Sequence, residues 1–157
     1  MRGRMAEPEM KIVMKRVTDL IPYARNPRKI PDSAIDGVAA SIKEFGFKQP
    51  IVIDRDGVIV VGHTRAKAAA KLGLSEVPCV TADELTPEQV KAYRLIDNKL
   101  SEKASWDYPL LQLEIAELDL TTDAIKLSFD EGDLAVITQA EWNPVSVAPP
   151  AGEDSSE

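Results

Sequence analysis

The apolar residues follow two spacings along the chain. Short runs rich in valine and isoleucine predict strands at 11–17, 49–54, 58–61 and 77–80. Longer segments with apolar residues every three or four positions predict helices at 33–45, 64–72, 86–100, 108–118 and 130–137. Asp56-Gly57, between the second and third runs, predicts a hairpin. Strands interleaved with helices predict an α/β (or α+β) fold, with a mixed sheet flanked by helices.

Two of these helices carry start signals. Ser33 with Asp36 resembles a capping box for the first helix, and Thr86 with Gln89 forms the same pattern for the third. The apolar stripes expected to pack against the sheet are Ile35, Val38, Ala39, Ile42 and Phe45 in the first helix, and Val90, Tyr93, Ile96 and Leu100 in the third.

Composition excludes several classes of protein. The chain has 157 residues, of which 44% are hydrophobic and 29% charged, as in an ordinary globular domain. No apolar run approaches the roughly 18 residues of a membrane span, and the opening MRGRMAEPEM lacks the apolar core of a signal peptide. One cysteine and one histidine argue against disulfides, multi-cysteine metal sites and zinc enzymes. These absences predict a cytoplasmic protein that does not contact membranes.

The segment VIVVGHTRAKAAAKLG carries the candidate chemistry. A strand ends at Gly62, where a missing Cβ allows close approach to the backbone, and a helix follows at once. The amides of His63, Thr64 and Arg65 then lie at the positive end of that helix without helical partners, which suits an anion. Thr64 adds a hydroxyl and Arg65 a guanidinium that fits phosphate oxygens. Taken alone, the segment also fits a purely structural strand–turn–helix.

Three sequence blocks follow one another across residues 11–105. They are NPRK followed by SIKEFGFKQPIVID, then GHTRAKAAAKLG followed by EVPCV, and finally RLIDNKLSE. In this order they resemble the ParB/sulfiredoxin superfamily. The resemblance is to the ParB-like N-terminal (ParB-like nuclease) domain of phage and plasmid proteins, which is also found fused to DNA methyltransferases.

The resemblance implies a nucleotide site that takes a nucleoside triphosphate of the CTP or ATP type. The residues that it implies for phosphate binding are Gly62, His63, Thr64, Arg65, Asn26, Arg28 and Gln49. It places a magnesium ion on Asp97 and Asn98, whose oxygens suit that cation. Arg65 and Asp97 become the candidate catalytic residues for weak nucleotide hydrolysis. His63 is interpreted as a helix cap or phosphate ligand rather than a general base.

The resemblance and the composition together divide the chain into four parts. These are a flexible N-terminus at 1–10, the ParB-like domain at 11–105, a helical extension at 106–140 and a disordered acidic tail at 141–157. Two other functions stay open: a metal-dependent DNase acting through Asp97 and Arg65, and a non-enzymatic adaptor for a DNA methyltransferase or another DNA-processing protein. A homodimer is also left open.

Charge is divided unevenly along the chain. Residues 1–71 hold fourteen Lys and Arg against eight Asp and Glu, whereas residues 72–157 hold five against eighteen. The first part is therefore at +6 and the second at −13, for a net charge of −7. The basic half can attract a ligand that carries phosphate, and the acidic half repels DNA.

We therefore expect weak binding to nonspecific duplex DNA, because counterion release needs a basic surface that the second half does not offer. An electrophoretic mobility-shift assay at low micromolar protein and physiological salt should show little or no complex. A tight complex that resists added salt would contradict this expectation.

Overall fold

The computed structural model describes residues 9–139, in which four strands form one mixed sheet. The strands are β1 (Ile12–Arg16), β2 (Ile51–Ile53), β3 (Ile59–Val61) and β4 (Glu76–Thr81), arranged in the order β1-β4-β2-β3. β4 is antiparallel to β1 and parallel to β2, while β2 and β3 form the predicted antiparallel hairpin. The four predicted strands and the mixed α/β (α+β) fold are confirmed.

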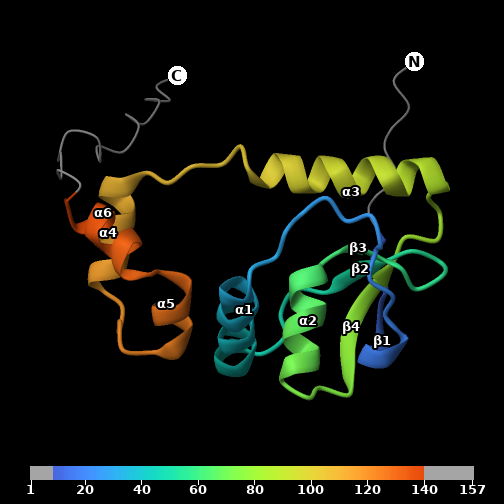
Figure 1. Cartoon of the computed structure of the whole chain (residues 1–157), viewed down its shortest axis with the longest axis horizontal. Helices are drawn as coiled ribbons and strands as arrows, with labels where there is room; N and C mark the ends of the chain where they lie inside the picture. The colour runs from blue at the N-terminus through green and yellow to red at the C-terminus, as the bar shows by residue number, and fades with distance from the viewer. Residues whose placement is uncertain (1–8, 140–157) are drawn as a thin grey trace, which may run out of the picture.

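Six α-helices are formed by the described residues in addition to the sheet. They are α1 (Asp32–Phe45), α2 (His63–Lys71), α3 (Pro87–Ser101), α4 (Tyr108–Ala116), α5 (Asp123–Ser128) and α6 (Glu131–Gln139), with a short 3-10 helix η1 (Val17–Asp19) after β1. Figure 1 shows α1 and α2 side by side next to the sheet, α3 across one end, and α4–α6 grouped beyond α1. α5, which the sequence pattern did not predict, packs against α1.

The core lies between the sheet and α2. Alternate residues of a strand point to the same face of the sheet. In this way β2, β3 and β4 turn their apolar residues towards the buried alanines of α2. The core cluster consists of Leu20, Ile51, Ile53, Ile59, Ala66, Ala69, Val77 and Cys79. Small alanine side chains let α2 lie close to the strands, so the start of α2 is held firmly at the end of β3.

The two predicted helix starts have different outcomes. At α3, Thr86 and Gln89 form the expected capping box. At α1 the prediction is wrong: the helix begins at Asp32 after Pro31, without a side-chain cap. Proline fixes φ near the value needed just before a helix, which sets the start without a capping side chain. Asp36 instead pairs with Lys71, which ties α1 to α2.

The predicted apolar stripes are only partly buried. On α1, Ala39 is buried but Phe45 is 58% exposed. On α3, Val90 is buried as expected, whereas Ile96 and Leu100 are 54% and 56% exposed. The α3 stripe fails because this helix packs through Val90 and a charged residue, Arg94.

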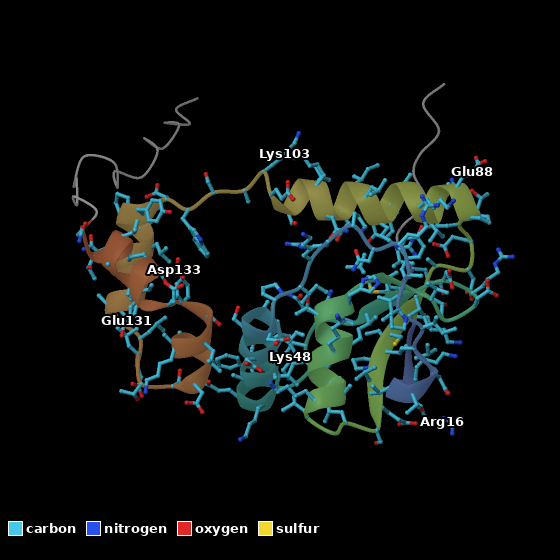
Figure 2. All side chains as sticks on the ribbon, in the orientation of Figure 1. Arg16, Lys48, Glu88, Lys103, Glu131 and Asp133 are labelled. Atoms are coloured by element: carbon cyan, nitrogen blue, oxygen red, sulfur yellow. The ribbon has the colours of Figure 1, made fainter. Side chains whose placement is uncertain are left out.

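Some expectations concern other parts of the chain. Residues 1–8 of the expected flexible N-terminus and the expected acidic tail at 141–157 lie outside the described residues. Within residues 9–139, no helix is long and apolar enough to cross a membrane. In Figure 2 the labelled Arg16 and Lys48 lie in the part that holds the sheet, whereas Glu131 and Asp133 lie on the C-terminal helices.

Candidate functional site

A pocket of about 530 Å³ lies where α1, α2, α3 and the loop at 21–31 meet. Its lining includes every residue that the sequence predicts for the site: Asn26, Arg28, Gln49, Gly62, His63, Thr64, Arg65, Asp97 and Asn98. The fold thus brings together residues from all three sequence blocks. Their individual roles stay predictions.

The start of α2 supplies the backbone part of the pocket. Gly62 is the N-cap residue and adopts the left-handed conformation, with φ 106° and ψ 29°. The first helical hydrogen bond runs from the Ala66 amide to the Gly62 carbonyl over 3.0 Å. Among the described residues no side chain caps this end, so the preceding amides remain available to a ligand at the positive end of the helix dipole.

Arg65 is held against the wall of the pocket. Its Nη1 donates to the carbonyl oxygens of Gln49 and Pro50, each over 3.1 Å, and lies 3.3 Å from Gln49 Oε1. Burial lowers the pKa of Arg65, while the charge of Asp97 acts in the opposite direction. Arginine stays protonated in proteins, so the pocket keeps a fixed cation next to a carboxylate.

His63 has a structural partner. Its Nε2 accepts a hydrogen bond from the Tyr23 amide over 3.2 Å, which requires that nitrogen to be unprotonated. Burial lowers the pKa of His63, and the charges of Arg94 and Lys67 lower it further. The neutral ring therefore anchors the loop at 21–31 to the start of α2, and Nε2 cannot also donate to a phosphate.

The loop and α3 meet at the other side of the pocket. Arg28 Nη1 donates to Asn98 Oδ1 over 3.2 Å, and the Arg28 amide donates to Asn26 Oδ1 over the same distance. Within the described part of the chain, the Asp97 carboxylate has no hydrogen-bond partner. It lines the pocket as an open acceptor, which is the state that a bound cation would need.

The sequence interpretation missed two groups of lining residues. Lys48 is a further cation, and it stands next to Gln49 in a block already singled out. The second group is an apolar wall formed by Ile30, Val38, Ile42, Phe45 and Phe47. This wall explains why the α1 stripe is incompletely covered, since it faces the pocket instead of the core. The spacing of apolar residues in the α1 segment indicated an apolar face, but it did not indicate which part of the molecule that face contacts.

The pocket is cationic although the chain is acidic. Arg28, Lys48 and Arg65 line it against the single carboxylate of Asp97, in a chain with a net charge of −7. Gathering positive charge in a concave surface strengthens its attraction for anions.

The chain matches the ParB N-terminal domain over residues 4–99. It belongs to the ParB N-terminal domain family. The resemblance predicted from the three sequence blocks is thereby confirmed, and with it the relation to proteins of chromosome partitioning.

Two relatives illustrate the extent of the match. The ParB-like nuclease domain-containing protein YnaK of Escherichia coli (strain K12) is 38% identical over 81 residues, which are 52% of this chain and 93% of that protein. The chromosome-partitioning protein Spo0J of Thermus thermophilus is 33% identical over 98 residues, which are 60% of this chain but only 36% of that protein.

The fold also resembles a solved structure. The C-terminally truncated chromosome-partitioning protein ParB from Caulobacter crescentus, complexed with CTP-gamma-S, superimposes with a TM-score of 0.60. The likeness covers 83% of this chain and 72% of that one at 22% sequence identity, so it concerns the fold.

Gly62 should tolerate substitution less well than Gly73, which also has a positive φ. An added Cβ would lie 3.2 Å from Arg65 Nε and Nη2 and 3.3 Å from Ile51 Cγ1, whereas one at Gly73 (φ 71°) meets no atom within 4 Å. Both alanine variants incur the left-handed penalty of about 1–2 kcal/mol. Urea denaturation should show a larger loss of unfolding free energy for Gly62→Ala than for Gly73→Ala. Equal losses would mean that the close contact with Arg65 is unimportant.

Proposed function

We propose that this ParB-like domain binds a nucleoside triphosphate with magnesium in the pocket at the start of α2. The observation that carries the proposal is the cationic lining in an acidic chain. Three positively charged side chains converge with the free end of a helix, and phosphate groups are the ligands that such an arrangement suits. The relation to a chromosome-partitioning protein supports a DNA-related role, and a phage or plasmid setting for that role is part of our proposal.

The phosphates would lie against α2. The amides at 63–65 supply neutral donors, Thr64 a hydroxyl and Arg65 a guanidinium. Arg28 and Lys48 approach from the loop and from the segment after α1, so they can neutralise further phosphate charge. A triphosphate carries enough negative charge to use all three cations at once.

The nucleoside would take the apolar side of the pocket. The wall formed by Ile30, Val38, Ile42, Phe45 and Phe47 offers a surface on which a flat ring can lie. Ser41 and Ser101 also line the pocket and supply hydroxyl groups at its edge. The Caulobacter protein that shares the fold is complexed with CTP-gamma-S, which makes CTP the first nucleotide to test and ATP the second.

The donor set fits a magnesium ion. The Asp97 carboxylate is a hard ligand in the pocket, and Mg²⁺ commonly combines one or two such groups with substrate phosphates and water. The Asn98 amide oxygen would join it by exchanging its hydrogen bond from Arg28 for the ion. When bound, the ion would neutralise phosphate charge. Arg65 and Asp97 are the residues that we assign to any slow hydrolysis, with Arg65 stabilising charge on the phosphate oxygens.

A second candidate is metal-dependent cleavage of DNA by Asp97 and Arg65. It is supported by the name of the Escherichia coli relative, a ParB-like nuclease domain-containing protein that the match covers almost completely. Nicking of supercoiled plasmid that requires magnesium and is lost in Asp97→Ala would favour this function over nucleotide binding. If the protein binds neither a nucleotide nor DNA, the adaptor role remains.

The nucleotide proposal predicts a large effect at Arg65. Arg65→Ala should lose about 1.5–3 kcal/mol of binding free energy, the range for hydrogen bonds to charged groups, or roughly tenfold to a hundredfold in affinity. Isothermal titration with CTP and ATP in magnesium measures the loss. Arg55→Ala is the matched control, because Arg55 is an exposed arginine of the hairpin that does not line the pocket. Equal affinities of Arg65→Ala and wild type would contradict the proposed phosphate site.

Asp97 should behave differently from Arg65. Since its proposed role runs through the metal, Asp97→Ala should weaken binding in magnesium and have little effect in chelator. Titrations under both conditions separate the two roles, with the exposed hairpin residue Asp56 replaced by alanine as the control. A loss of the same size with and without magnesium would mean that Asp97 acts on the protein or nucleotide directly.

A further inference from the structure

Arg94 is a buried cation outside the pocket lining. Its side chain lies on α3 and the residue is only 3% exposed. Its Nη2 donates to the Ile59 carbonyl of β3 over 3.2 Å, and no described residue is a hydrogen-bond partner for its Nε. The salt bridges found in residues 9–139 do not include it. A guanidinium in such a place needs another source of stabilisation.

The ring of Tyr23 provides that stabilisation. The guanidinium carbon of Arg94 lies 3.6 Å from the centroid of the Tyr23 ring, well within the range of a cation–π interaction. This contact strengthens when water is excluded from it, as it is around a residue this buried. Arg94 and Tyr23 therefore form a pair that joins α3 to the loop at 21–31.

The same pair is connected to the rest of the site. The Tyr23 amide donates to His63 Nε2 at the start of α2, and Arg94 is bonded to β3. On α3, only Val90 and Arg94 are buried, so Arg94 is the buried contact nearest Asp97 and Asn98, beside the exposed Arg28–Asn98 hydrogen bond. Asp97 and Asn98 follow Arg94 by three and four positions, which places them on the same helix face.

We infer that the Arg94–Tyr23 pair is a positioning element of the pocket, which holds α3 and the loop so that Asp97, Asn98, Asn26 and Arg28 face one ligand. The inference rests on the proposed nucleotide function. Neither member of the pair lines the pocket, so both act through the residues that do. If they served only the stability of the fold, their loss would lower the melting temperature but leave the affinity of the folded protein unchanged.

The Tyr23 variants test this with a conservative rescue. Tyr23→Leu removes the aromatic face and should lower affinity for CTP or ATP in magnesium by about tenfold, whereas Tyr23→Phe keeps the face and should bind within about twofold of wild type. Isothermal titration well below each melting temperature, with folding checked by circular dichroism, restricts the comparison to folded protein.

The Arg94 variants complete a double-mutant cycle. Arg94→Met should weaken binding about as much as Tyr23→Leu, and the double variant should be no weaker than either single one, because both substitutions break the same contact. Lys91→Met is the matched control: it removes a positive charge from the exposed side of α3 and should leave affinity unchanged. If Arg94→Met does not fold, the comparison of Tyr23→Leu with Tyr23→Phe decides whether the contact positions the pocket.

The outcomes separate the two claims. Wild type that binds a nucleotide, together with Tyr23→Leu that binds it equally well, overturns the positioning role and leaves the proposed function intact. Equal losses in Tyr23→Leu and Tyr23→Phe also overturn it, because the aromatic face would then be irrelevant. Wild type that binds neither CTP nor ATP overturns the proposed function, and the positioning role falls with it.

Discussion

The left-handed turn at Gly62 is the constraint on which the site depends. With a φ of 106°, this residue is the single connection between Val61, where β3 ends, and His63, where α2 begins. As a result, the amide end of α2 opens directly above a buried strand. The missing Cβ also leaves the space in which the Arg65 guanidinium lies, 3.2 Å from where that carbon would be. One turn therefore provides both a backbone anion site and a fixed cation. The small alanine side chains of α2 allow this helix to pack closely against the core.

Features set by local sequence could be predicted. The hairpin at Asp56-Gly57, the capping box at Thr86 and the strand–turn–helix at Gly62 depend on residues a few positions apart, and each is present as expected. The site residues could be predicted because the three sequence blocks resemble those of a known family. That they line one pocket follows from the parallel pairing of β2 with β4 and the placement of α3, which no single block encodes.

Features set by tertiary packing could not be predicted. Periodicity indicated that Ile96 and Leu100 of α3 face the core, but the helix instead buries Arg94. The free-energy cost of burying this charge is offset by the ring of Tyr23, which lies 71 positions earlier in the chain. A pattern of apolar residues carries no signal for such a pair. The apolar face of α1 was recognised, but whether it meets the core or a ligand pocket depends on elements that the pattern does not place.

The central claim is that the pocket binds a nucleotide through its phosphates, and thermal unfolding of the wild-type protein tests it most directly. A ligand that binds only the folded state raises the melting temperature, and the rise grows with the ratio of ligand concentration to dissociation constant. Each of the four ribonucleoside triphosphates, with magnesium, is compared with its own nucleoside at the same millimolar concentration. We expect at least one triphosphate to raise the melting temperature while its nucleoside does not. If no triphosphate raises it, or if the nucleoside raises it equally, the phosphate site is contradicted.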